Sequence, residues 1–120
     1  MAGTLTISTL SDGTNSTSST NCIQGSAKAW VNFNGSTAAI RASYNVGSIT
    51  KNSTGNYTVN LTNAMSDANY SISTTGWANI GVLARFSQVA GTPTTSSFIV
   101  VTDGVTGVAD LTYVYAAIFR

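Results

Sequence analysis

Three residues in the second half of the chain carry side chains that could bind a sugar: Trp77, Asn79 and Arg85. The indole of an exposed tryptophan can stack on a sugar ring, and a nearby asparagine amide can donate to and accept from hydroxyl groups. An arginine guanidinium binds carboxylate or phosphate, which are the charged groups of acidic glycans and of lipopolysaccharide. We therefore interpret these three residues as candidate ligand-binding residues for a carbohydrate.

Structural roles are also open to the same residues. Trp77 could fill the core or a subunit interface at a strand end, because large aromatic side chains are highly buried on average. Arg85 alternates with Leu83 in an apolar stretch. Its guanidinium could pair with an aspartate across a subunit contact or extend to water while its stem stays packed.

Most of the side chains that enzymes use for acid–base and nucleophilic catalysis are missing. The chain has no His and no Glu, and its four acidic residues are all Asp. Without imidazole there is no Ser-His-Asp or Cys-His relay, and glycan cleavage by two carboxylates would depend on aspartates alone. No P-loop, G-x-G-x-x-G or G-x-S-x-G motif occurs. We expect neither an enzyme nor a cofactor.

The aspartates are better explained as turn residues than as metal ligands. Asp103 precedes a glycine and Asp67 lies in an Asp-Ala-Asn run, both of which are typical of turns, and Asp110 is interpreted in the same way. The single cysteine, Cys22, cannot form a disulfide within the chain and has no basic neighbour to activate its thiol. We expect no metal site, and we expect Cys22 to fill a small apolar gap.

The composition favours an uncharged, all-β domain. Only 8% of the residues are charged, the net charge is +1, and Ser, Thr and Asn together supply 46 of the 120 residues. A hydrophobic content of 42% argues against disorder, and the scarcity of Leu, Glu, Lys and Arg argues against a helical bundle. Five dispersed cations give no basic face for nucleic acid. No stretch approaches the roughly 20 apolar residues of a membrane span, so we expect no membrane insertion.

Alternation of polar and apolar residues predicts strands along nearly the whole chain. The predicted strands cover residues 4–8, 28–33, 38–46, 57–62, 70–74, 82–86, 97–102 and 111–119, with a kink or short strand at 47–50. Asn34-Gly35 is a strong signal for a tight hairpin turn. The strands of the first half are expected to form an antiparallel meander with one solvent-exposed face.

The last predicted strand is apolar on both faces. One face carries Leu111, Tyr113, Tyr115, Ala117 and Phe119, and the other carries Val114, Ala116 and Ile118. A two-sheet sandwich buries one face of each sheet internally. The second face of this strand therefore needs another partner, and a second copy of the chain is the economical one.

The domain boundary is expected near residue 22. Residues 11–21 contain no apolar side chain to bury, which predicts a loop or linker. We interpret residues 1–21 as an N-terminal strand and a polar linker or stalk junction, and residues 22–120 as one compact domain. The expected fold class is an all-β, antiparallel, jelly-roll-like β-sandwich.

A long part of the sequence resembles the C-terminal tip domains of bacteriophage tail fibre proteins, including those of phages that infect cyanobacteria. The resemblance is carried by residues 22–35 (CIQGSAKAWVNFNG), 40–46 (IRASYNV), 48–50 (SIT), 54–61 (TGNYTVNL) and 64–71 (AMSDANYS). The family more often has Asp at the place of Asn56 and Pro at that of Ser66. The closing residues 114–120 (VYAAIFR) also resemble the family's usual chain end, which implies that Arg120 is the natural terminus.

The resemblance implies a trimeric tip that belongs to the virion, is made in the bacterial cytoplasm and works outside the cell. Its partners would be two further copies, other tail fibre or baseplate proteins, and a host surface polysaccharide or lipopolysaccharide bound non-covalently. Trp30, Tyr44, Tyr57 and Tyr70 have the phase for core or subunit contacts, and residues 76–110, which match least, would carry specificity. A glycan-cleaving tailspike fragment and a purely architectural trimerisation module are the alternatives.

Overall fold

The computed structural model describes residues 2–78, 86–104 and 107–120. Within these residues 54% of the chain is strand and 7% is helix, which confirms the all-β expectation. The elements are β1 Thr9–Ser11, β2 Ser16–Ser18, α1 Ser19–Gly25, β3 Ala27–Phe33, β4 Ile40–Tyr44, β5 Val46–Ser53, β6 Asn56–Leu61, β7 Ser71–Trp77, β8 Phe86–Ala90, β9 Ser97–Gly104, β10 Gly107–Val108 and β11 Tyr113–Phe119.

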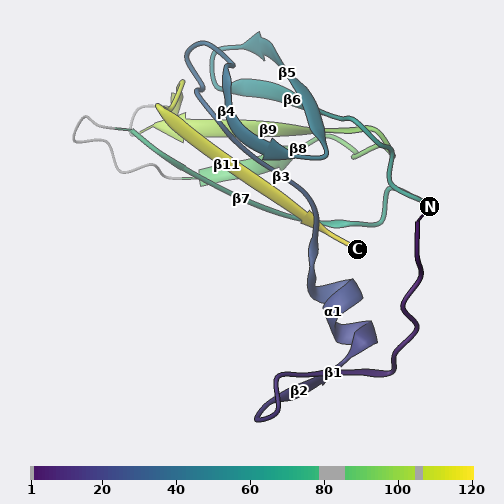
Figure 1. Ribbon diagram of the computed structural model, residues 1–120. Coiled ribbons are helices and arrows are strands. Elements are labelled where there is room, and N and C mark those ends of the chain that lie inside the picture. The colour runs from purple at the N-terminus through teal and green to yellow at the C-terminus, as the bar shows by residue number, and fades with distance from the viewer. Residues whose placement is uncertain (1, 79–85, 105–106) are drawn as a thin grey trace.

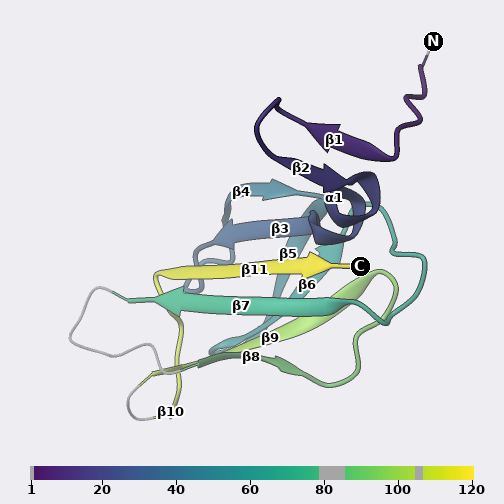
Figure 2. The same ribbon diagram turned by 90° about the horizontal axis from the view of Figure 1, so that it is seen from below.

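Two antiparallel sheets form the body of the molecule (Figure 1). The first has the strand order β4-β3-β11-β7. In the second, β9 lies between β6 and β8, β5 is next to β6, and β10 pairs with the end of β9. Figure 2 shows the first sheet nearer to the viewer and the second sheet behind it. A separate two-stranded ribbon, β1-β2, and the helix α1 precede this body.

One hydrophobic core joins the two sheets. The ring of Phe33 on β3 meets the ring of Tyr57 on β6 edge to face, with 5.1 Å between centroids. Tyr70 and Phe98 make a second edge-to-face contact at 6.3 Å. The alternation of side chains expected from the sequence is present in β11, where every second residue points into the core and is buried. These are Val114, Ala116 and Ile118.

The expected meander is wrong, because the chain changes sheets between β4 and β5. Asn45 adopts a left-handed conformation with φ 53°, which an asparagine tolerates better than most residues. Its side chain secures the crossing. Asn45 Oδ1 accepts from the backbone N–H of Asn63 at 2.8 Å, and its amide group donates to the carbonyl oxygen of Lys28 at 3.2 Å. Strands β4 and β5 consequently lie in different sheets.

The connection after β3 is also longer than the tight turn predicted at Asn34-Gly35. It spans residues 34–39 and is closed by a hydrogen bond from the Asn34 N–H to the Ala39 carbonyl at 2.9 Å. Gly35 is required by packing rather than by the turn, since a Cβ added there would lie 2.6 Å from the Leu111 carbonyl oxygen. Leu111 precedes β11 and is buried in the core, which corrects its expected place in that strand on one face with Tyr113 and Tyr115.

The first residues of the chain differ most from expectation. No strand covers residues 4–8, and the first strand is β1 instead. The polar tract at 11–21, expected to be a loop or linker, contains β2 and the beginning of α1. The prediction failed because it relied on apolar periodicity, and this segment is organised by polar side chains.

Short polar side chains make these local structures. Asp12 Oδ1 accepts from the backbone N–H of Asn15 at 2.7 Å and so closes the turn between β1 and β2. Ser18 caps α1, because its hydroxyl oxygen accepts from the backbone N–H of Asn21 at 3.1 Å. Asx turns and N-caps of this kind need only residues that are abundant throughout the chain.

The second half follows the prediction only in part, since β8 covers residues 86–90 and shares only Phe86 with the strand predicted at 82–86. Strand β9 extends the strand expected at 97–102 as far as Gly104, so that Asp103, expected in a turn, lies in a strand and pairs with Val108. Residues 82–85 of the predicted strand at 82–86 lie outside the described residues. Among the residues that are described, no helix is long and apolar enough to span a membrane.

Candidate functional site

Exposed aromatic side chains gather on the outer face of the first sheet. Trp30 is 42% exposed, Tyr44 58%, Trp77 49% and Tyr115 36%. Each strand of the sheet contributes to the group, because β3, β4, β7 and β11 all present alternate residues outward. We call this surface, formed by Trp30, Tyr44, Trp77, Tyr113 and Tyr115, the aromatic face.

Strand register brings these rings together. Tyr113 is paired with Trp77 across β11 and β7, and the two ring centroids are 5.5 Å apart. Tyr113 and Tyr115 lie nearly parallel, with 6.3 Å between centroids and 10° between ring planes. On the other side of β11, Trp30 is paired with Tyr44 across β3 and β4. The aromatic face therefore extends across the full width of the sheet.

A fixed positive charge lies at one end of this surface. The guanidinium carbon of Arg41 is 4.1 Å from the centroid of the Tyr113 ring, a cation–π contact. Arg41 also donates from an NH2 group to the Thr112 carbonyl oxygen at 2.8 Å. Two contacts orient the guanidinium, so it can present its remaining N–H groups to an anionic group beside the aromatic rings.

A shallow hollow of about 350 Å³ lies between the rings of Trp30 and Tyr115. Ala117, which pairs with Trp30 on one side and Ser73 on the other, leaves room in the middle of the sheet. The volume is in the range of small-molecule sites, which start at about 300 Å³. Its lining consists of Trp30, Val31, Asn32, Ser73, Thr74, Thr75, Tyr115, Ala116 and Ala117.

Hydrogen-bonding groups surround this hollow. Ser73 and Thr75 are exposed on the outer side of β7. Asn32 Oδ1 is buried, and no hydrogen-bond donor among the described residues reaches it. Because a buried acceptor without a donor is costly, a rotation of the Asn32 side chain that brings this oxygen to a ligand hydroxyl in the hollow would be favourable. The hollow thus combines two aromatic rings with hydroxyl and amide groups.

The residues predicted to bind a ligand have different outcomes. Trp77 lies on the aromatic face, half exposed, and is not a core residue. Asn79 and Arg85 lie outside the described residues. Of the four aromatic residues assigned to core or subunit contacts, Tyr57 and Tyr70 are buried in the core, whereas Trp30 and Tyr44 are exposed on the aromatic face.

Sequence reasoning missed Asn32, Arg41 and Tyr115 as parts of a site. The alternation of the last strand placed Tyr115 on one face with Tyr113, but it did not show which face of the strand lies outside. No local signal identifies Asn32 or Arg41. Their roles depend on strand pairing, and Arg41 reaches a residue 71 positions away.

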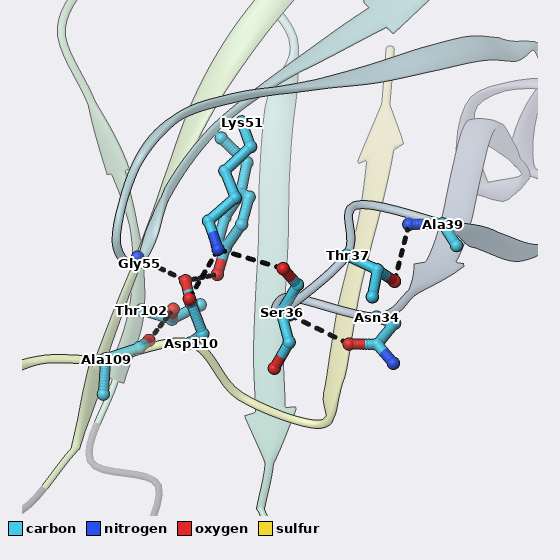
Figure 3. Close-up of polar contacts among 10 residues, drawn as sticks. Asn34, Ser36, Thr37, Ala39, Lys51, Gly55, Thr102, Ala109 and Asp110 are labelled. Carbon is cyan, nitrogen blue, oxygen red and sulfur yellow. Dashed lines mark hydrogen bonds and ion pairs between the residues drawn. The ribbon is translucent and has the colours of Figure 1, made fainter.

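A second cluster of polar groups is centred on Asp110, where the loop before β11 meets the β5-β6 turn and the connection after β3 (Figure 3). Asp110 Oδ1 accepts from the Tyr57 hydroxyl at 2.6 Å and from the Gly55 N–H at 2.8 Å. Asp110 Oδ2 accepts from Lys51 Nζ at 2.5 Å, and Lys51 also donates to the Ser36 carbonyl oxygen at 3.0 Å. The cluster ties three separate loops together, which corrects the interpretation of Asp110 as a simple turn residue.

Burial and hydrogen bonds within this cluster shift the pKa values of Asp110 and Tyr57. Burial opposes the charge on Asp110, but hydrogen bonds from Lys51, Tyr57 and Gly55 outweigh it and hold the pKa of the carboxyl below its usual value. Burial, together with the hydrogen bond to Asp110, raises the pKa of the Tyr57 hydroxyl well above its usual value. These shifts describe a stabilising contact, since a catalytic acid would need a raised carboxyl pKa.

The remaining acidic residue interpreted as a turn residue, Asp67, behaves as predicted. Its Oδ1 accepts from the Asn69 N–H at 2.8 Å, and the carboxylate also forms an ion pair with Arg120. Within residues 2–78, 86–104 and 107–120, no three Cys or Asp side chains come together as metal ligands. Cys22 is a partly buried free thiol in α1.

Raised tyrosine pKa values predict a loss of stability in alkali. Above the unfolded-state tyrosine pKa of about 10, the unfolded chain loses protons that folded Tyr57 keeps, so the free energy of unfolding falls by up to about 1.4 kcal/mol per pH unit. Urea unfolding midpoints measured between pH 8 and pH 11 should show this decline. Tyr57→Phe should make it shallower without abolishing it, because burial also raises the pKa of Tyr70. An equally steep decline in the variant would contradict the assignment.

Comparisons with known proteins return no match for this chain. No model of a protein family matches it, and neither a curated protein nor a solved structure does. The resemblance to tail fibre tips stays a prediction from the sequence.

Proposed function

We propose that this chain is the receptor-binding tip domain of a bacteriophage tail fibre, which binds a host surface polysaccharide or lipopolysaccharide non-covalently. The aromatic face carries the proposal. Its exposed Trp30 and Trp77 offer flat apolar surfaces for sugar rings, and the neighbouring Ser73, Thr75 and Asn32 offer hydroxyl and amide groups for sugar hydroxyls. A sugar uses both kinds of group, because its ring stacks on aromatic side chains and its hydroxyls form hydrogen bonds.

Neutral sugars are the best match for the hollow, and a ligand with an occasional anionic group suits its edge. Trp30, Asn32 and Tyr115 carry no charge, so stacking and hydrogen bonds would dominate binding there. Arg41, held against Tyr113 at the same face, supplies a site for a carboxylate or phosphate of an adjoining residue of the glycan.

The alternative of a glycan-cleaving enzyme has less support. Hydrogen bonds lower the pKa of Asp12, Asp67 and Asp110, in the last case against the effect of burial. The general acid of a glycoside hydrolase needs a raised pKa instead. Asp67 and Asp110 are also paired with Arg120 and Lys51 rather than facing the hollow.

The proposed assembly is a homotrimer of β-sandwiches at the end of a fibre in the virion. The single core between two antiparallel sheets supports the sandwich, and adjacency of the first and last strands of the body, β3 and β11, is a jelly-roll feature. In a jelly roll, consecutive strands mostly alternate between the two sheets. Here each of three hairpins keeps both of its strands in the same sheet, which departs from that pattern; they are β3-β4, β5-β6 and β8-β9. Other tail fibre or baseplate proteins would connect through the N-terminal side of the tip.

Binding should depend on the aromatic face. Fluorescently labelled protein applied to an array of bacterial polysaccharides and lipopolysaccharides should bind a subset of them. Trp30→Ala should weaken that binding about tenfold or more, which corresponds to roughly 1.4 kcal/mol of lost stacking. Asn32→Ala should also weaken it while leaving stability unchanged or higher, because the variant removes an unpaired buried oxygen.

Val108→Ala is the matched control, because it removes an exposed apolar side chain from the second sheet. Binding that survives both Trp30→Ala and Trp77→Ala would rule out the aromatic face as the site. No binding to any glycan would favour the architectural module. New reducing ends released from a bound polysaccharide would instead favour the tailspike alternative.

A further inference from the structure

Residues 2–25, which we call the N-terminal arm, fold without a core. The arm consists of an extended start, the β1-β2 ribbon and α1, and Figure 1 shows the ribbon and helix set apart from both sheets, below the start of β3. The helix has no buried residue, and every residue of β1 is exposed. The arm is joined to the body at Lys28, whose ammonium group donates to the Ile23 carbonyl oxygen and to Ser26 Oγ.

The arm nevertheless carries aliphatic side chains that normally avoid water. Leu5 is 81% exposed, Ile7 39%, Leu10 53% and Ile23 64%. They are not scattered, because all four line one hollow of about 370 Å³ together with Cys22. Covering such a cluster would contribute about 25 cal/mol for each Å² removed from water.

The arm is also too small to be stable without that cover. Its ribbon has strands of three residues and its helix has seven residues. Isolated helices shorter than about 12 residues and isolated two-stranded hairpins are marginal in water. The capping and turn contacts of Ser18 and Asp12 define the conformation, but the free energy that holds it must come from a surface outside the arm.

The chemistry of the arm selects another arm as its partner. Asp12 is the only charged residue between positions 2 and 25, so two or three arms can approach closely with little electrostatic repulsion. The cluster is aliphatic and contains no aromatic ring, which suits protein packing and not sugar stacking. Rotational symmetry would repeat one contact around the axis, so that the cluster with Leu10 and Ile23 in each arm is covered by a neighbouring arm.

We propose that the N-terminal arm is the self-association element of this protein, and that its apolar cluster packs against the arms of other copies of the chain. The proposal rests on the trimer proposed above and assigns its contact surface. It also separates two tasks, because association through the arm leaves the aromatic face free for a ligand. The outer face of β11 is then a binding surface and not the subunit contact expected from the sequence.

The test compares two double variants of the full chain by sedimentation velocity at micromolar concentration. Leu10→Ser with Ile23→Ser removes the centre of the arm cluster, and Trp30→Ser with Trp77→Ser changes the aromatic face to a similar extent. We expect a trimer for the original chain and for the aromatic variant, and a monomer for the arm variant. A trimeric arm variant, a monomeric original chain or dissociation of the aromatic variant would overturn the proposal.

Two further measurements keep the result interpretable. Near-ultraviolet circular dichroism should be the same for the arm variant and the original chain, because no arm residue belongs to the hydrophobic core. Alkylation of Cys22, the only cysteine, should be slower in the assembled protein than in the arm variant. Equal alkylation rates in an assembled and a monomeric sample would place the contact elsewhere.

Glycan binding by the monomeric arm variant, measured separately, tests the proposed function independently of assembly.

Discussion

Asp110→Ala is expected to lower the free energy of unfolding by about 3 kcal/mol, because three donors lose their acceptor. The Tyr57 hydroxyl and the Gly55 N–H are left without a partner, and Lys51 loses its counter-ion. Buried donors that lose a partner cost about 1–3 kcal/mol each, and the partly exposed Lys51 contributes less. Urea unfolding at pH 7 measures the change.

A graded series separates the contributions. Asp110→Asn keeps an oxygen for Tyr57 and Gly55 but loses the ion pair, so its effect should be clearly smaller than that of Asp110→Ala. Asp67→Asn is the surface control, since it breaks the exposed pair with Arg120 and should cost at most about 1 kcal/mol. Equal effects of Asp110→Ala and Asp67→Asn would show that the Asp110 cluster does not stabilise the fold.

The same cluster contributes to the loss of stability in acid. The folded-state pKa of Asp110 is lowered, so its contribution is present above the unfolded-state value of about 3.9 and is lost as pH falls through the folded value. Asp110→Asn should therefore lose less stability than the original chain between pH 5 and pH 2, which unfolding midpoints across that range would measure.

The second large effect is expected for Gly55→Ala, which should lower the free energy of unfolding by about 4 kcal/mol. Gly55 has φ 62°, and an added Cβ would lie 2.6 Å from the Thr102 carbonyl oxygen and 2.9 Å from the Ala109 nitrogen. Both neighbours are backbone atoms that cannot rotate away. The Thr102 N–H also donates to the Gly55 carbonyl oxygen at 2.8 Å, so a shift of the turn would break that bond.

Gly91→Ala supplies a matched control for the backbone strain. Gly91 has a similar φ of 68°, but an added Cβ meets no atom nearer than 4.0 Å, at Ile99 Cδ1. Its cost should be limited to the left-handed conformation, about 1–2 kcal/mol. Thermal unfolding of both variants measures the difference, and similar melting temperatures would contradict a role for close packing at Gly55.

How far the sequence predicts this fold depends on the kind of interaction that forms each part. Alternation of side chains identified β3, β6, β9 and β11, because burial of one face imposes a period of two residues. It could not reveal the N-terminal arm, where Asp12 and Ser18 act through backbone hydrogen bonds that leave no periodic trace. It also could not reveal the change of sheets at Asn45, which depends on one positive φ.

The candidate site was predictable only in part for a related reason. Trp77 was identified from its residue type and polar neighbours, and its exposure agrees with a binding role. The hollow beside Trp30 depends on the pairing of β3, β11 and β7, strands that are far apart in the sequence. The contacts of Asp110 span 53 to 59 positions along the chain, so local patterns contain no information about them.

The position of β11 between β3 and β7 has a consequence for biosynthesis. β11 follows β3 and β7 in the sequence but lies between them in the first sheet, so until it is in place β3 and β7 lack their shared neighbour. Contacts between such distant segments form slowly and late. The first sheet can therefore close only after residues 113–119 have been synthesised. A chain that stops before Tyr113 lacks this strand, so β3 and β7 would each expose an unpaired edge. Such a chain should be more susceptible to proteases and to aggregation than the folded domain.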